Sequence, residues 1–398
     1  MSQSKDIYLD NAATTKLRPE VLDAMMPYLT SEYGNPSSLY PLGESAAAAI
    51  AEARNIAARA LGAKDREIIF TSGGTEADNM ALIATAEAYA ERGRHIVTSA
   101  IEHHAVLHAC AYLEKRGFEV TYLPVDEYGL VSPVALEASL RPDTILASIM
   151  FANNEIGTIE PIAELGAIAH QHGVIFHTDA VQAFGHLPID VDAMNIDLLS
   201  ASSHKIYGPK GTGMLYRRRG IKGGAFIHGG QQERGMRAGT ENVAGIVGFA
   251  KAIELALAEQ ETEAARMIDL RNYAITRILN EIPHSRLNGH AAKRLPNNVN
   301  CSFEFIEGEG MLLQLAFKGV SASSGSACTS GSLDPSHVLL AIGLPHEIAH
   351  GSLRLTLGHD TTHADVDFAI DALKGTVANL RAMSPLYEDF MKEQLVAV

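Results

Sequence analysis

A regular alternation of strand-like and helix-like segments between Glu67 and Arg218 constrains the fold of this chain more than any other feature. Short runs rich in Ile, Val, Leu and Phe alternate there with longer segments of helical character. Such repeated strand–helix–strand units predict an α/β fold with a mostly parallel central sheet and helices on both faces. The expected strands are 68–71, 95–99, 119–125, 144–151, 174–178, 197–201 and 214–216, and the helices between them include 76–91 and 162–171.

The segments on either side predict a second, smaller domain. Further expected elements are helices at 45–61 and 242–281, the latter broken near its acidic middle, strands at 298–305 and 352–357, a helix after Gly308 and terminal helices. We therefore expect a large domain over residues 16–260. A small α+β domain would combine residues 1–15 and 261–398 and carry the Ser-rich loop 321–332.

Composition excludes several classes of partner. A formal net charge of −15 with scattered Lys and Arg leaves no basic face for a phosphate backbone, so nucleic acid is not expected. The three cysteines, Cys110, Cys301 and Cys328, are too few for a disulfide framework and favour a reducing cytoplasm. The chain has no apolar signal region and no run of about 18 apolar residues, so we expect no membrane association.

Cys328 lies in a run of small residues, Ser321–Ser332, in which it alone carries strongly nucleophilic chemistry. Buried thiols usually lie among large apolar residues, whereas Ser and Gly favour a solvated backbone, so the pattern indicates an exposed thiol. An idle surface cysteine is the alternative from this segment alone, because reactivity depends on surroundings that favour the thiolate.

Polar residues at two strand ends form the strongest chemical pattern. Asp179 follows the apolar run 174–178, and Lys205 follows the run 198–202, next to His204. Pyridoxal phosphate chemistry uses such a pair, because Lys forms a Schiff base and an acid keeps the pyridine nitrogen protonated. Singly, each residue is more simply a surface or turn residue. Jointly they favour a cofactor site at the carboxyl ends of the strands.

A glycine turn in Thr71–Asp78 offers a place for a phosphate group. Gly73 and Gly74 stand between an expected strand and an expected helix, where backbone amides can approach an anion. Thr75 and Asp78 also match a loose capping box, so a purely structural turn is the alternative. The turn has neither the Walker pattern nor Gly-x-Gly-x-x-Gly, which makes nucleotide binding a weaker interpretation.

These segments resemble the cysteine desulfurases of the NifS and IscS type, in the aminotransferase class V branch of the pyridoxal-phosphate enzymes. The likeness covers nearly the whole chain, and its most specific motif is Ser323–Ser330 around Cys328. It implies the aspartate aminotransferase-like fold of the PLP-dependent transferases. The other matching segments are 8–15, 34–38, 73–76, 102–103, 153–157, 179–182, 202–205 and 237–240.

The resemblance implies roles around the cofactor, pyridoxal 5'-phosphate. Lys205 would hold the cofactor as a Schiff base and later move protons, and His103 would stack on its ring as an acid or base. Asp179 would pair with the pyridinium nitrogen and Gln182 with the ring hydroxyl. The phosphate would be held by Gly74, Thr75, Ser202 and His204, and by Thr240 from a partner subunit.

The implied reaction removes sulfur from L-cysteine, releases L-alanine and leaves a persulfide on Cys328. Asn154 and Arg354 would bind the substrate carboxylate, the arginine through a bidentate pair, because an unpaired arginine in an apolar strand would be costly. The sulfur would pass to an iron–sulfur scaffold or another sulfur-acceptor protein. The role of Thr240 also implies a homodimer.

Other interpretations stay open. A selenocysteine lyase or another class V enzyme would share the cofactor residues, although the motif around Cys328 argues against plain transamination. A protein that only stores sulfur would not need Lys205.

A zinc hydrolase would use His346-Glu347-x-x-His350, in which two histidines lie one helical turn apart. Pro345 and Gly351 leave little helix to display both imidazoles, so we expect no metal site. Other close histidine pairs are expected on helix surfaces: His104 with His108, and His170 with His172.

Overall fold

The computed structural model of the protein describes residues 6–324 and 335–396. Within these residues the strands form a seven-stranded main sheet, a three-stranded small sheet and a two-stranded pair. The main sheet has the order β2 (Ile68–Thr71), β8 (Gly213–Arg217), β7 (Leu198–Ser202), β6 (Ile175–Asp179), β5 (Thr144–Ser148), β3 (His95–Ser99) and β4 (Glu119–Leu123).

The main sheet is parallel from β4 to β7, and β8 runs antiparallel to both of its neighbours. The connection 203–212 is too short for the crossover that a parallel partner of β7 would need, so β8 returns beside β7 in the opposite direction. All residues of β5, β6 and β7 are buried, as expected for strands covered on both faces. The predicted α/β architecture is therefore confirmed.

Alternate side chains of the central strands pack into separate cores on the two faces of the main sheet. Phe176 and Leu199 contribute to one core, and their neighbours Ile175 and Leu198 contribute to the other. The helices that cover these faces and flank the sheet are α1 (Pro19–Thr30), α2 (Pro41–Arg59), α3 (Gly74–Asn79), α4 (Thr85–Ala88), α5 (His104–Glu114), α6 (Pro133–Ser139) and α7 (Ile162–Gln171). Short turns of other helical types are η1 (Asp65–Glu67), η2 (Met80–Ala84), η3 (Ser203–Lys205) and η4 (Gln232–Gly235).

A third core forms around the small sheet and includes the N-terminal residues Ile7 and Leu9. The small sheet is antiparallel, and the separate pair β1–β11 is parallel. The elements here are β1 (Ile7–Tyr8), β9 (Ser285–Leu287), β10 (Asn298–Phe303), β11 (Val320–Ser321) and β12 (Ser352–Thr356), with helices α9 (Gly308–Phe317), α10 (His337–Ala341), α11 (His346–His350), α12 (His363–Ala382) and α13 (Pro385–Val396).

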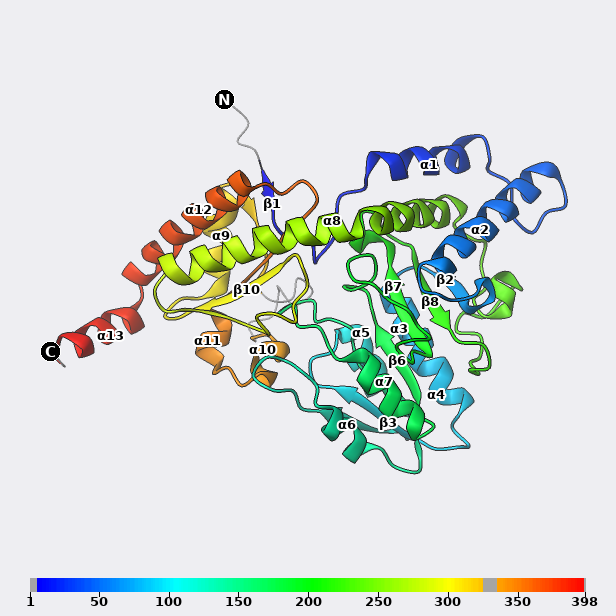
Figure 1. The fold of residues 1–398 in the computed structure, drawn as a ribbon, viewed down its shortest axis with the longest axis horizontal. Coiled ribbons are helices and arrows are strands. Elements are labelled where there is room, and N and C mark those ends of the chain that lie inside the picture. The colour runs from blue at the N-terminus through cyan, green and yellow to red at the C-terminus, as the bar shows by residue number, and fades with distance from the viewer. Residues whose placement is uncertain (1–5, 325–334, 397–398) are drawn as a thin grey trace.

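Helix α8 (Val243–Glu281) joins the two parts of the molecule. Figure 1 shows it passing from beside α1 and α2 at the main sheet to beside α12 and β10. Ile253 near one end belongs to the main-sheet core, and Met267 belongs to the small-sheet core. The predicted break is wrong, because the acidic residues in the middle pair with arginines or point to solvent and the backbone continues unbroken over 39 residues.

The other expected elements differ from the structure mainly at their ends, apart from the expected helix 76–91. That segment contains a π-helical turn, Met80–Ala84, between α3 and α4, and Met80 and Leu82 of this turn pack into the core. The domain boundaries after residues 15 and 260 stay predictions. Among the described helices, none combines the length and apolarity needed to cross a bilayer.

Gly213 provides a test of how tightly β8 packs. A Cβ atom on this residue would lie 2.7 Å from the carbonyl oxygen of Ala201 and 2.7 Å from Cα of Gly73, so Gly213→Ala must displace backbone. We expect a loss of about 1–3 kcal/mol in the free energy of unfolding, measured by urea denaturation. Gly224→Ala is the matched control, because that Cβ would meet nothing within 4 Å. If the two variants are equally stable, the close contact of Gly213 with Ala201 and Gly73 is wrong.

Candidate active site

A cavity with about 820 Å³ of empty space opens at the carboxyl ends of β6 and β7. The N-terminal segment and β12 of the small sheet supply the opposite wall. Apart from Thr240, every described residue with a predicted role lines this cavity. The lining residues are Ala12, Ala13, Gly74, Thr75, Asp78, His103, Met150, Ala152, Asn154, Asp179, Val181, Gln182, Ser202, His204, Lys205 and Arg354.

Lys205 ends the short turn that follows β7. Its Nζ donates hydrogen bonds to the carbonyl oxygens of Ala12 at 2.5 Å and Ala13 at 2.8 Å. Gln182 donates from Nε2 to the same oxygen of Ala12 at 3.1 Å. The N-terminal segment therefore holds the amine at the cavity wall, where it could form a covalent bond with a carbonyl cofactor.

Asp179 lies at the end of β6, and its Oδ1 accepts a hydrogen bond from the backbone N–H of Val181 at 2.9 Å. Burial raises the pKa of Asp179 to about 6, against the opposing effects of that bond and of Lys205. Burial also raises the pKa of Asp78, and the nearby charge of Asp179 raises it further. Negative charge therefore resides on Asp179 rather than on Asp78, and a cationic ring nitrogen beside Asp179 would stabilise it.

His103 is the N-cap of α5, where its Nδ1 accepts a hydrogen bond from the backbone N–H of Ala105 at 3.1 Å. Burial, followed by the charge of Lys205, lowers the pKa of His103 to about 4. The imidazole is therefore neutral at neutral pH. Because Nδ1 acts as the acceptor, this bond assigns the ring proton to Nε2.

Beside His103, the Glu102 carboxyl is fully buried. Its Oε1 accepts bonds from the Ser99 hydroxyl at 2.7 Å and the Met150 N–H at 2.8 Å, while Oε2 has no hydrogen-bond partner in the described part of the chain. Burial raises the pKa of Glu102 to about 8, so this residue is a neutral acid at neutral pH.

The part of the cavity next to the start of α3 suits a phosphate group. A Cβ atom on Gly74 would lie 2.6 Å from Cγ2 of Val181 and 3.6 Å from Cβ of Ser202, so only glycine lets the backbone come this close. An adjoining hollow shares Gly74, Thr75, Ser202 and His204 with the cavity and adds Lys210. Hydroxyl groups, backbone amides and a lysine are ligands that bind anions.

Arg354 on β12 is only 1% exposed. Its guanidinium donates from Nη1 to the carbonyl oxygen of Asn154 at 2.9 Å and from Nη2 to Oδ1 of Asp10 at 2.8 Å. The sequence predicts that this buried charge needs a carboxylate partner, and Asp10 is one within the protein. The contact of Arg354 with a substrate carboxylate stays a prediction. The buried Nε has no hydrogen-bond partner among the described residues and is left for a ligand.

Thr240 does not reach the cavity of its own chain. It is exposed and borders a separate hollow with Ser72, Gly211 and Arg237. Arg237 in turn donates from Nε to Oε1 of Glu76 on α3 at 2.9 Å. The phosphate contact predicted for Thr240 stays a prediction about a second subunit.

Cys328 lies outside the described residues. The chain before residue 325 pairs with β12, since the backbone N–H of Ser323 donates to the carbonyl oxygen of Arg354 at 3.2 Å. On the other side, the Ser336 hydroxyl donates to Glu155. Both flanks of the predicted cysteine loop are therefore held close to residues of the cavity wall.

The histidine clusters do not form a metal centre. Helix α11, with His346 and His350, is a single turn, as Pro345 and Gly351 predict. In residues 6–324 and 335–396, no group of three or more His, Cys, Asp or Glu side chains could hold a metal ion.

The expectation of a surface position is right for His108 but wrong for His104. The His104 ring is half-buried and lies 4.9 Å from the ring of His337 and 5.2 Å from that of His108. Because α10 packs His337 over the start of α5, His104 lies between the two rings. His170 and His172 are exposed, as expected.

Sequence reasoning missed two acids at the site: Asp78, which lines the cavity, and Asp10, which pairs with Arg354. The capping box of Thr75 and Asp78 does not form, because the N-cap of α3 is Gly73 and Asp78 points into the cavity instead. The only signal for Asp10 was its place in the matching segment 8–15, and its pairing with Arg354 depends on contact between the two ends of the chain.

The residues present fit pyridoxal phosphate. An amine, a buried carboxylate, a neutral imidazole and a hollow lined by hydroxyl groups and Lys210 surround one cavity. The unpartnered Nε of Arg354 adds a position for a carboxylate. This arrangement can bind an amino acid next to a covalently held carbonyl group.

Comparison with known proteins gives one consistent result. The aminotransferase class-V family model matches residues 7–368. Cysteine desulfurase IscS of Methanosarcina thermophila is 58% identical over 385 residues, which cover 97% of this chain and 95% of that protein.

Two solved structures are similar over most of their length. A NifS-like protein has a TM-score of 0.89 and 37% identity, covering 94% of this chain and 100% of its own. The structure of SspA in complex with cysteine has a TM-score of 0.78 and 40% identity, covering 88% of this chain and 98% of its own.

The neutral state of Glu102 predicts a pH effect on stability. In the unfolded chain the carboxyl ionises above its ordinary pKa of 4.5, whereas in the folded protein it stays protonated up to about 8. Stability from this group is therefore lost as pH rises through that window. Glu102→Gln removes the effect and keeps the acceptor oxygen.

Between about pH 5 and pH 8, the free energy of unfolding of Glu102→Gln relative to wild type should rise by about 1 kcal/mol or more, measured by urea denaturation. Glu388→Gln, on the exposed surface of α13, is the control and should follow wild type. A pH-independent difference for Glu102→Gln would show that this carboxyl is ionised in the folded protein.

Proposed function

We infer that this chain, which belongs to the aminotransferase class-V family, is a cysteine desulfurase that depends on pyridoxal 5'-phosphate. It is a transferase that removes sulfur from L-cysteine and leaves L-alanine. The observation that carries this conclusion is the meeting of Lys205, Asp179 and His103 in one cavity, in a chain 58% identical to a cysteine desulfurase.

The cofactor, when bound, supplies an electron sink that stabilises negative charge on the α-carbon of an amino acid. The chain supplies the groups that hold it. Lys205 would form the covalent link through Nζ and later move a proton through the same atom. Asp179 would hold the proton on the ring nitrogen, and Gln182, already directed into the cavity, would donate to the ring hydroxyl.

His103 would lie against the ring and donate a hydrogen bond from its neutral Nε2–H. Its low pKa of about 4 supports this role, because the ring is neutral and carries one proton in a defined place. Gly74, Thr75, Ser202 and His204 would bind the phosphate group.

Arg354 would bind the substrate carboxylate through Nε and one Nη nitrogen, opposite the wall that carries Lys205. This contact would place the substrate amine toward the cofactor. Asn154 supports the site, since its carbonyl oxygen already orients Nη1 of Arg354. The solved complex of SspA with cysteine, 40% identical to this chain, supports cysteine as the substrate.

Cys328 would receive the sulfur as a persulfide. Its two alternatives are poor nucleophiles, because Cys110 and Cys301 are buried in the cores. Burial raises the pKa of Cys110 well above the usual thiol range and that of Cys301 to about 12. Neither forms a thiolate at neutral pH, so Cys328 is the remaining cysteine of the chain that can attack sulfur.

The working form would be a homodimer. Helix α1 and the segment after it expose apolar side chains that a second copy could cover: Leu22, Met26, Leu29, Tyr33 and Leu39, the last 94% exposed. Thr240 is exposed and would complete the phosphate site of the partner.

The reduced Cys110 and Cys301 support a cytoplasmic location. An iron–sulfur scaffold or another sulfur-acceptor protein would take the persulfide sulfur.

The catalytic assignment is tested with L-cysteine and two variants. Lys205→Ala should lose the visible absorbance of the covalently bound cofactor and all alanine formation. Cys328→Ala should still change absorbance when L-cysteine is added, yet lose more than about 99% of sulfide release in the presence of a reductant.

Cys110→Ala serves as the matched cysteine control and should keep full turnover, because its thiol is buried away from the cavity. Normal turnover by Cys328→Ala would sink the proposed role of that thiol. A wild-type protein without any cofactor absorbance would overturn the function as a whole.

The dimer is tested through Thr240. Light scattering after size exclusion should give twice the 42.6 kDa chain mass. Thr240→Ala should weaken cofactor binding by about tenfold, the effect of losing one hydrogen bond to a charged group. A monomeric, fully active wild type would contradict the shared site.

A further inference from the structure

Tyr207, two residues after Lys205, has an unusual backbone conformation. Its φ angle is +65°, in the left-handed region that residues with a side chain rarely adopt. Such a conformation costs free energy and persists only where the surroundings hold it. The contacts around Tyr207 explain what holds it.

The N-terminal segment fixes the backbone of this turn. The N–H of Tyr207 donates to Oγ1 of Thr15 at 2.8 Å, and its carbonyl oxygen accepts from the N–H of Arg18 at 3.1 Å. Thr15 also donates from its own N–H to the carbonyl oxygen of His204 at 3.0 Å. The turn from His204 to Tyr207 is therefore bound at both ends to residues 15–18.

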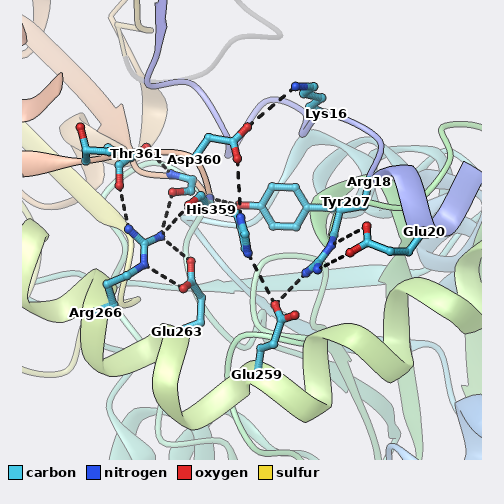
Figure 2. Close-up of polar contacts among 12 residues, drawn as sticks. Lys16, Arg18, Glu20, Tyr207, Glu259, Glu263, Arg266, His359, Asp360 and Thr361 are labelled. Atoms are coloured by element: carbon cyan, nitrogen blue, oxygen red, sulfur yellow. Dashed lines mark hydrogen bonds and ion pairs between the residues drawn. The ribbon is translucent and has the colours of Figure 1, made fainter.

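The side chain of Tyr207 connects the same turn to the loop Gly358–Thr361, which follows β12. Its hydroxyl oxygen accepts a hydrogen bond from the backbone N–H of His359 at 2.8 Å, and the two rings meet edge to face at 6.2 Å. Figure 2 shows His359 between Tyr207 and Glu259 of α8. Burial raises the pKa of Tyr207 to about 12, so the hydroxyl stays neutral.

Helix α8 holds the far side of this loop. Arg266 donates to the carbonyl oxygens of Thr361 at 2.7 Å, His359 at 3.0 Å and Gly358 at 3.1 Å, and it pairs with Glu263 (Figure 2). These bonds make the loop a firm support for the Tyr207 hydroxyl.

A second pair of contacts links α8 to the N-terminal segment. Glu259 accepts from Nη1 of Arg18 at 2.7 Å and lies 3.7 Å from Nε2 of His359. Helix α8, which joins the two sheets, therefore also contacts both segments that hold the Tyr207 turn: residues 15–18 and the loop after β12.

We propose that Tyr207 is a positioning residue for Lys205. Its hydroxyl fixes the turn that carries the lysine relative to the loop Gly358–Thr361. The amine of Lys205 rests on the carbonyl oxygens of Ala12 and Ala13, in the segment that also binds the Tyr207 backbone. Asn11 in turn donates from Nδ2 to the carbonyl oxygen of Thr356 on β12 at 2.8 Å. Two sets of contacts therefore link Lys205 to the small sheet, one through the N-terminal segment and one through Tyr207. The Tyr207 hydroxyl can be removed without changing a residue that lines the cavity.

This inference rests on the proposed function, in which Lys205 holds the cofactor and moves a proton. Proton transfer depends steeply on the placement of the donor and acceptor, so a small shift of the turn changes the chemical step more than it changes substrate binding. Tyr207 itself does not line the cavity.

The test uses Tyr207→Phe, which removes only the hydroxyl, in the cofactor-loaded enzyme. We expect kcat for alanine formation to fall by about threefold to tenfold, with KM for L-cysteine within about twofold of wild type. In the absence of substrate, the pH midpoint of the cofactor's visible absorbance should shift by at least about 0.3 units, because that titration reports the surroundings of the Lys205 nitrogen.

The matched control is Tyr273→Phe. That hydroxyl donates to Oδ1 of Asp367 at 2.6 Å, between α8 and α12, and neither residue lines the cavity. The control should keep the wild-type kcat and absorbance midpoint. If Tyr207→Phe matches this control in both measurements, the positioning role is wrong.

A second variant keeps the test decisive where Tyr207→Phe does not fold. Arg266→Gln releases the loop carbonyls without changing Tyr207 or the cavity, and it should shift the absorbance midpoint in the same direction as Tyr207→Phe. An unshifted midpoint would overturn the inference. Wild type that forms no alanine would instead refute the proposed function, so the two failures are distinguishable.

Discussion

The parallel pairing of β6 with β7 is the constraint on which the rest of the site depends. Their register places Asp179 opposite Ser200, so both strands end at the same edge of the sheet. The carboxylate of Asp179 and the turn that carries Lys205 therefore line one cavity. The N-terminal segment binds the turn that follows β7, and its carbonyl oxygens receive the amine of Lys205.

Several buried ionisable groups lie in the cavity or next to the residues that line it, although burying such groups usually lowers stability. Glu102 and Asp78 are kept neutral by burial, and His103 is kept neutral by burial and the charge of Lys205. Arg354 is balanced by Asp10 but keeps one nitrogen without a partner among the described residues. Burying each of these groups costs folding free energy, and such perturbed groups are typical of functional sites.

The two sheets act together because α8 and the N-terminal segment run between them. Helix α8 contributes to both cores, and its acidic middle binds Arg18 on one side and, through Arg266, the loop after β12 on the other. Tyr207 connects that loop to the turn of Lys205. The site is therefore not a property of the main sheet alone, since the geometry of its lysine depends on contacts with the small sheet.

The α/β architecture and most of the residues that line the cavity could be predicted from the amino-acid sequence. Strand alternation is a local pattern, and Asp179, Lys205 and His103 lie in motifs that a family resemblance identifies. Three features became visible only in the folded chain: α8 is unbroken, Asp78 points into the cavity rather than capping α3, and Asp10 pairs with Arg354. Tyr207 likewise gave no local signal. These features depend on contacts between residues far apart in the chain, and no periodicity or short motif encodes which distant groups will meet.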